Sequence, residues 1–300
     1  MNRRAALLLG ILVALLIAYI FYWFDVKANV VAQYNTWQKE QTAAGATISP
    51  DISVGGFPFA VTLRSDNFKY ERADAFRINI PDLKLSVNPL TPFRITATSE
   101  SPAKFYFFKA NYTFTTKSLM VSVARPLFKA RGKNDNGLFV QVRLTSLGLD
   151  ESHKVALGNL VQELSFKAKV KGVSPMWDDK KSVEAWRDSE GSIDLDRVFL
   201  NWGSLLVNAK GNLVLDKDNQ PNATLSSTIS GYEQAIDVLR DQNQVQPIVA
   251  SVIKAALKLL EDPKTPPGEV KTIRVPVTIK DSKLSIAGVD ITSWDPYPVP

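Results

Sequence analysis

The 300-residue sequence contains no cysteine and only one histidine. Without cysteine the chain forms neither disulfide bonds nor thiolate metal sites, so the stability of the fold depends on its core. One histidine without cysteine also cannot supply the usual ligands of a zinc site. A cysteine-free exported protein fits a bacterial periplasm better than a small eukaryotic secreted domain, which usually needs disulfides.

Signatures of catalysis are equally scarce. The histidine, His153, adjoins Ser152 in a polar segment, whereas the members of a catalytic triad are brought together by the fold. The acidic turn at residues 216–219 lacks the central glycine and distal glutamate of a calcium loop, which favours a hairpin turn. There is no phosphate-binding loop and no dinucleotide fingerprint. We therefore predict a protein that is not an enzyme and assign no catalytic residue, cofactor or metal ligand; an envelope hydrolase that uses His153 is the opposing hypothesis.

What the sequence does contain is one long apolar run at residues 5–24, which follows Arg3 and Arg4. About 20 apolar residues suffice to cross a bilayer as a helix. Basic residues favour the cytoplasmic side and aromatic rings favour the headgroup level, so residues 1–25 predict a cytoplasmic stub and a single transmembrane anchor. The predicted anchor residues are Leu7, Leu12, Leu16, Tyr19, Phe21, Tyr22, Trp23 and Phe24.

A cleaved signal peptide is the alternative interpretation of this segment. Signal peptides have a shorter apolar region and end in small residues. Here the flank is bulky, although residues 26–28 (Val-Lys-Ala) offer a weak cleavage site. We favour an uncleaved signal anchor, and the sequence leaves cleavage itself open.

Residues 26–45 predict a stalk helix. Val26, Val30, Tyr34 and Trp37 recur at helical spacing, and Gly45 is a suitable C-terminal stop. This stripe could dock on the membrane surface or on the protein's own domain, and the second is the expected arrangement.

Residues 46–300 predict one β-rich periplasmic domain. Apolar and polar residues alternate at 76–87, 138–144 and 273–279, as in strands with one buried and one solvated face. Such strands are typical of antiparallel sheets. Turn-forming residues at 132–137 and 216–221 separate strand-like runs.

Helices are expected only late in the body, at residues 182–187, 232–239 and 248–260. In the last helix one apolar face is formed by Ile248, Val252, Ala256, Leu259 and Leu260. This face predicts that the pair covers an apolar sheet. The fold class is therefore mainly β (α+β): an N-terminal transmembrane helix, a large curved antiparallel sheet with a possible groove, and a C-terminal helical pair covering it.

Two aromatic segments suggest where an apolar groove would lie. One is KFYFFK at residues 104–109, where both faces of a strand are apolar, and the other is GGFPF at residues 55–59, where glycines permit a kink. Burial in the core is the simpler interpretation of each. The candidate groove residues are Phe57, Phe59, Phe105, Phe107, Trp202 and Tyr232.

Several segments together resemble a Gram-negative bacterial family, domain of unknown function 2125. They are the N-terminal span, GGFPF, the WG step at 202–203, the G-x-L-x-L-D strand at 211–216, the GY helix entry at 231–232 and VPVTIKD at 275–281. Ser282 stands where this resemblance leads us to expect glycine. The family brings no assigned catalytic residues. The late strands are also similar to those of AsmA-type envelope proteins, which implies a membrane-anchored periplasmic sheet with a groove that accommodates lipid.

The functional expectation follows from the anchor and the strands. We predict a single-pass protein of the bacterial inner membrane that binds or transfers lipid or another apolar envelope component in a sheet groove. The alternative is a structural module that scaffolds envelope assembly through a protein partner. The first 150 residues carry 18 Lys and Arg against 10 Asp and Glu, and the rest carry 18 against 20. This basic first half would suit anionic headgroups, and it is too dilute for nucleic acid.

Overall fold

The structure is a computed structural model that describes residues 3–49, 51–72, 75–108, 112–125, 137–150, 155, 157–172, 180–261 and 271–293. His153 and the predicted turn at 132–137 lie outside these residues, apart from Gly137. The described chain is mainly β, with antiparallel strands and four helices, as predicted. It forms two compact units, Met1–Thr113 and Phe114–Pro300, called unit 1 and unit 2 below.

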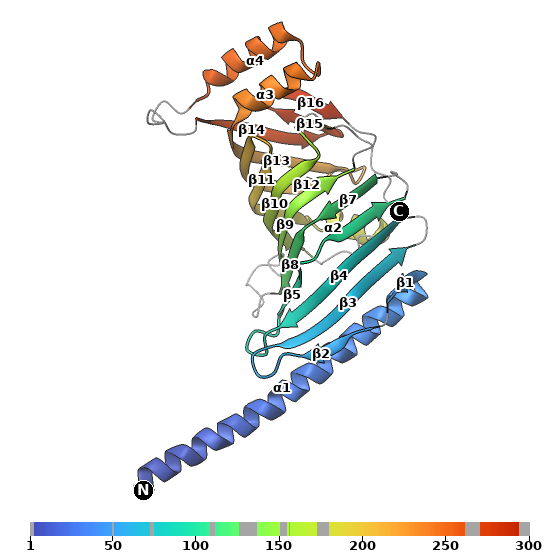
Figure 1. The fold of residues 1–300 in the computed structure, drawn as a ribbon, viewed down its shortest axis with the longest axis vertical. Helices are drawn as coiled ribbons and strands as arrows, with labels where there is room; N and C mark the ends of the chain where they lie inside the picture. Colours follow the sequence, from blue (N-terminus) through green and yellow to red (C-terminus); the bar gives the residue numbers. More distant parts are fainter. Residues whose placement is uncertain are drawn as a thin grey trace. The chain divides into compact units, whose positions relative to one another are not determined.

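Unit 1 consists of one long helix and a small antiparallel sheet (Figure 1). In the sheet β3 pairs with β1, β2 and β4, and β4 also pairs with β5 and β6. The elements are α1 (Arg3–Ala43), β1 (Ala46–Ile48), β2 (Ser53–Gly55), β3 (Val61–Arg72), β4 (Phe76–Val87), β5 (Arg94–Ser99) and β6 (Ala103–Phe107).

The helix α1 runs without a break through both the predicted anchor and the predicted stalk. It ends where Gly45 adopts a φ of +85°, a left-handed conformation that glycine enters without penalty. The Gly45 amide donates to the carbonyl of Thr42, which satisfies one of the free acceptors at the helix end. The predicted C-terminal stop is thereby confirmed.

Strand β4 is long because it tolerates a proline at the point where its partner changes. Residues Lys84–Val87 pair with β5 and residues Phe76–Asn79 pair with β6. Pro81 lies between these two sections, where its missing N–H breaks no ladder. The next residue, Asp82, has a φ of +53°, and Ser99 donates its hydroxyl to the Pro81 carbonyl at 2.7 Å. The strand therefore bends here without losing its pairing to β3.

Unit 2 is an antiparallel meander in which each strand pairs with the next from β8 to β16, and β7 pairs with β9. Short hairpins suffice for such a sheet, which explains the regular turn signals in the sequence. The strands are β7 (Tyr112–Thr116), β8 (Ser118–Ala124), β9 (Leu138–Leu149), β10 (Leu160–Lys171), β11 (Ser192–Trp202), β12 (Leu205–Leu215), β13 (Pro221–Ser230), β14 (Thr272–Lys280), β15 (Lys283–Ile286) and β16 (Val289–Ser293).

The short helix α2 (Lys180–Asp188) holds its place through one buried tryptophan. Trp186 is almost fully buried, and its indole Nε1 donates to the Lys171 carbonyl at 2.6 Å. The ring lies so close to Gly191 that a Cβ there would collide with it. A buried indole needs this hydrogen bond because its N–H would otherwise lose water without replacement.

Helices α3 (Tyr232–Asp241) and α4 (Pro247–Lys258) pack on the β13–β14 end of unit 2 (Figure 1). Their shared cluster contains Ile229, Tyr232, Ile236, Ala250, Ile273 and Val275. Gly231 enters α3 with a φ of +71° and lies against the Ser204 carbonyl, where a side chain would not fit. The expected helical pair over the sheet is confirmed.

The face that α4 turns towards the sheet was predicted wrongly. Its most apolar face is exposed: Ile248 is 79% and Leu259 86% accessible. Ala250 is the buried residue instead, and Lys254 turns towards α3 to pair with Asp237. The ion pair and the small alanine allow the close approach of the two helices, and the larger side chains point away.

Candidate functional site

The first half of α1 is almost bare. The helix is long and apolar enough to cross a membrane, and very little of its most apolar stretch is buried. Leu7, Leu12 and Leu16 are exposed, as are Phe21 and Phe24. A core helix of a soluble protein would be covered on at least one side, and this stretch is not.

Three aromatic residues fasten the helix to unit 1 where this bare segment ends. The Tyr19 and Tyr22 hydroxyls donate to the carbonyls of Pro58 at 2.5 Å and Pro89 at 2.8 Å. The Trp23 indole Nε1 donates to the Ala60 carbonyl at 3.1 Å. We call Tyr19, Tyr22 and Trp23 the aromatic clasp. The sequence placed these three rings at the membrane headgroups, and the structure adds a bonded partner for each.

The clasp continues into an apolar stripe along α1. Trp23 is 3% exposed and packs with Val26, Val30 and Val61 in one cluster. Further on, Trp37 stacks on Tyr70 of β3 with 6.2 Å between ring centroids, and the Tyr70 hydroxyl donates to Gln41. The predicted docking of the stalk helix on its own domain is confirmed, and its stripe begins three residues earlier, at Trp23, than the sequence indicated.

Two loops meet the clasp, and both present apolar side chains. Residues 55–60 join β2 to β3, and residues 88–93 join β4 to β5; we call them the apolar loop pair. They lie at the same end of the β3–β4 hairpin because Val61 pairs with Val87. Phe59 is 82% and Leu90 74% exposed, and Phe57 and Phe93 are about half exposed.

Phe57 and Phe59 differ in what they touch. Phe57 makes an edge contact with Trp23, with 5.2 Å between centroids, whereas Phe59 points away from the protein. Gly56 has a φ of +99°, and a Cβ there would collide with the side chain of Thr62. Glycine is therefore required for this turn. The glycine–proline pattern correctly indicated a bend at this position, but the burial that the sequence favoured for both phenylalanines is wrong, because each ring is at least half exposed.

The other candidate groove residues are placed elsewhere. Phe105 and Phe107 lie on β6, where Phe107 is paired with Phe76 at the opposite end of the β3–β4 hairpin from Phe59. Trp202 ends β11 in unit 2 and donates its indole N–H to the Gly158 carbonyl at 2.8 Å. Tyr232 is the first residue of α3, and its side chain is buried between that helix, α4 and the sheet. Within each unit, the structure does not gather these residues around one hollow.

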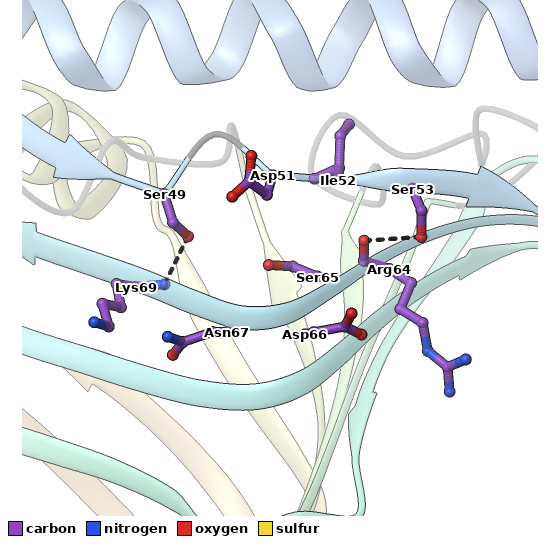
Figure 2. A pocket seen from close by; sticks show the side chains of 9 residues that line it. All are labelled: Ser49, Asp51, Ile52, Ser53, Arg64, Ser65, Asp66, Asn67 and Lys69. Carbon is purple, nitrogen blue, oxygen red and sulfur yellow. Dashed lines mark hydrogen bonds between the residues drawn. The ribbon is translucent and has the colours of Figure 1, made fainter.

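Two hollows lined by described residues are polar. Figure 2 shows the larger, of about 550 Å³, between the β1–β2 link and β3. There Ser49 accepts a bond from the Lys69 amide at 2.9 Å, and Ser53 donates to the Arg64 carbonyl. The second, of about 240 Å³, contains the Arg143–Glu163 ion pair at 3.1 Å. Pockets for apolar ligands are lined mostly by apolar side chains, and these are not.

Among the described residues, no three His, Asp or Glu side chains gather as a metal site. Asp216 instead accepts backbone bonds from Asp218 and Gln220, which is the predicted hairpin turn. Burial opposes ionisation of Asp194, but hydrogen bonds from Lys171 and Asn212 outweigh it and keep the Asp194 pKa below its ordinary value. This carboxylate is satisfied within the sheet.

Sequence reasoning missed the 88–93 half of the apolar loop pair. Its sequence, NPLTPF, contains two prolines and two large apolar residues, much as GGFPF does. Proline in a loop beside an unpaired aromatic residue was the available signal. This signal could not be interpreted from the sequence alone, because the residues at 88–93 give no indication that they contact a helix more than sixty residues away.

The fold is thus of the class in which a β-rich body binds a long apolar N-terminal helix along its first sheet. The chain belongs to the family described as an uncharacterized protein conserved in bacteria, domain of unknown function 2125, whose model matches residues 23–126 and 111–294. No curated protein and no solved structure matches the chain. The predicted family membership is confirmed.

Proposed function

We propose that this protein is a single-pass protein of the bacterial inner membrane whose periplasmic body is a non-enzymatic interaction module. In this proposal the first part of α1 crosses the bilayer, with Arg3 and Arg4 on the cytoplasmic side. The body then scaffolds other components of the envelope at the membrane surface.

The aromatic clasp is the observation that carries this proposal. A flexible linker would let a domain drift from its anchor, but here one helix leaves the apolar segment and enters the fold. Tyr19, Tyr22 and Trp23 then bond this helix to the loops of the unit 1 sheet. A tether of this kind suits a protein that must present a surface at a defined position above the membrane.

The polar hollows favour the interaction module over the lipid carrier as the first choice. A module also needs a surface for a partner, and the uncovered face of α4 supports one on unit 2. Exposed apolar patches of such extent are uncommon on monomeric soluble domains without a role.

Cysteine labelling tests the topology cleanly because the chain has no cysteine of its own. The variants Asn2→Cys and Lys210→Cys of the full chain would be treated in intact spheroplasts with a maleimide that cannot cross the membrane. We expect labelling at 210, and at 2 only after lysis. Labelling of 2 before lysis, or release of the chain by alkaline carbonate, would refute the proposal.

Lipid transfer is the second candidate function, and the same α4 face favours it, since an acyl chain can cover exposed Ile248 and Leu259. The full chain in donor vesicles would be assayed for transfer of a fluorescent phospholipid to acceptor vesicles. The variant Ile248→Asp/Leu259→Asp is the control. Transfer that is lost in this variant supports the carrier; no transfer above protein-free vesicles eliminates it.

A further inference from the structure

We infer that the apolar loop pair, residues 55–60 and 88–93, is a second membrane-contact site that inserts into the lipid beside the anchor helix. This inference rests on the proposed transmembrane position of α1. It adds a lipid-binding surface that belongs to the body of the protein rather than to its span.

The first argument is depth. A span of residues 5–24 covers about 30 Å, which is the thickness of the hydrocarbon core. Tyr19 lies five residues before the end of that span, hence roughly 7 Å below the outer boundary. Since the Tyr19 hydroxyl is bonded to the Pro58 carbonyl, the 55–60 loop reaches the same depth. Interfacial protein segments insert to a comparable depth of about 5–10 Å.

The second argument is the chemistry of the side chains. Phe59 and Leu90 expose most of their surface, and they lie in the two loops that Tyr19 and Tyr22 bond. We call these two side chains the apolar collar. In water this collar would be costly, whereas in the acyl region each ring or aliphatic side chain gains by leaving water. Phenylalanine and leucine are typical of such interfacial segments.

The third argument is that backbone polar groups of the two loops are hydrogen-bonded within the protein. Lipid offers no hydrogen bonds, so a loop can enter it only if its own polar groups are satisfied. The clasp side chains bond the carbonyls of Pro58, Ala60 and Pro89. Ala60 donates to Gly56, Thr91 donates to Asn88, and the Asn88 side chain accepts from Leu90.

Prolines further reduce the number of backbone N–H groups that need a hydrogen-bond acceptor. Pro58, Pro89 and Pro92 have no N–H to satisfy. The two loops are thus poor in free donors at the positions that reach deepest. This is a reason for their proline content that turn formation alone does not require.

The rim of the collar is basic. Lys27 lies one turn beyond Trp23, with its ammonium 5.9 Å from the Trp23 and Phe24 ring centroids. Arg94 follows Phe93 and is exposed. Lysine and arginine at this level reach lipid phosphates while their aliphatic stems remain in the apolar zone. The ligand is therefore the phospholipid headgroup and upper acyl region of the leaflet that the anchor exits.

Spin labels on the full chain test the inference. Single variants Phe59→Cys and Leu90→Cys would carry a nitroxide in proteoliposomes of phosphatidylethanolamine and phosphatidylglycerol. We expect their relaxation to respond more to oxygen than to a water-soluble nickel chelate, as at a buried depth in lipid. Lys69→Cys, an exposed position on β3 of the same unit, is the control and should show the reverse.

A second measurement separates insertion from simple proximity. The label at Phe93→Cys would be compared with the same label in Phe59→Asp/Leu90→Asp, whose two replaced side chains make few contacts in the protein. We expect oxygen accessibility at 93 to fall to the value of the Lys69 control in the variant. If the labels at 59 and 90 are exposed to water in a chain that resists carbonate extraction, the loop insertion is wrong but the anchor stands. If carbonate releases the chain from the vesicles, the proposed anchor itself is wrong.

Discussion

At the scale of single residues, Trp23 joins the exposed apolar part of α1 to the fold. Its ring is buried among Val26, Val30 and Val61, and its one polar atom is bonded to the Ala60 carbonyl. A tryptophan at a membrane boundary normally sits at the headgroups. Here Trp23 is a core residue of unit 1 instead, because the start of β3 packs against α1 at this position.

Trp23→Ala should lower the stability of unit 1 by roughly 3–5 kcal/mol, the usual cost of deleting a buried tryptophan side chain. Thermal unfolding of the full chain in detergent micelles, followed by circular dichroism, would measure it. Phe21→Ala is the matched control, because Phe21 is exposed on the same helix and should change the midpoint little. Equal midpoints for the two variants would mean that the clasp does not stabilise the fold.

The Tyr232–Glu261 pair gives the α3–α4 end of unit 2 a defined pH dependence. The Tyr232 hydroxyl donates to Glu261 and Lys271 pairs with the same carboxylate, which together lower the Glu261 pKa below 4.5. Burial, and then this bond, raise the Tyr232 pKa above 10.0. Glu261 stabilises the fold above pH 4.5 and loses this effect as the pH falls through its lowered pKa. Tyr232 stabilises it below pH 10.0 and loses this effect as the pH rises through its raised pKa.

We therefore expect the unfolding midpoint to be level between these limits and to decline on both sides. Glu261→Gln should flatten the acid side of the profile relative to the parent chain, since glutamine does not titrate. Thermal melts from pH 3 to 11 would record this. An acid decline that is unchanged in the glutamine variant would assign the effect to other carboxylates.

At the scale of elements, α4 shows how a correct helix can be oriented incorrectly. The 3.6-residue pattern of Ile248, Val252 and Leu259 identified a helix with one apolar face. Nothing in the pattern says whether the protein's own sheet, a lipid or a partner covers that face. The Lys254–Asp237 ion pair and the buried Ala250 decided the orientation, and both depend on α3 being in place.

The variant Ile248→Asp/Leu259→Asp should leave stability within about 0.5 kcal/mol per site, because both side chains are exposed. Ala250→Asp on the same helix should cost at least about 2 kcal/mol, since it buries a charge under α3. Denaturant unfolding compares the two. A strongly destabilised double variant would show that the large apolar residues, not Ala250, form the contact with unit 2.

At the scale of the whole molecule, the sequence predicted the fold class, the family and the course of α1, because these depend on local periodicity and on motifs spread along the chain. The antiparallel meander of unit 2 follows from alternating strands, most of them joined by short turns and two pairs of them joined through helices. The clasp was not predictable in the same way, since Tyr19, Tyr22 and Trp23 find partners 37 to 67 residues away. Contacts between residues so far apart produce no periodic pattern in the sequence.

The clasp also distinguishes the two interpretations of the N-terminal segment. Cleavage after Ala28 would remove all three clasp residues and Val26 from unit 1. A signal peptide is discarded and has no part in the mature fold, whereas Trp23 and Val26 are buried in the core of unit 1. Retention of the segment stays a prediction.

Two chimeras separate the span from the clasp. Replacing residues 1–18 by an unrelated leucine–alanine span should preserve membrane attachment and thermal stability, because Leu7, Leu12 and Leu16 touch little of unit 1. Replacing residues 1–28 by the same span should keep attachment but lower the melting temperature and the resistance to protease, since Trp23 and Val26 are lost. Carbonate extraction and limited proteolysis of both chimeras would measure this. If the two chimeras are equally stable, the sheet of unit 1 folds without residues 19–28, and this part of α1 only attaches the body to the membrane.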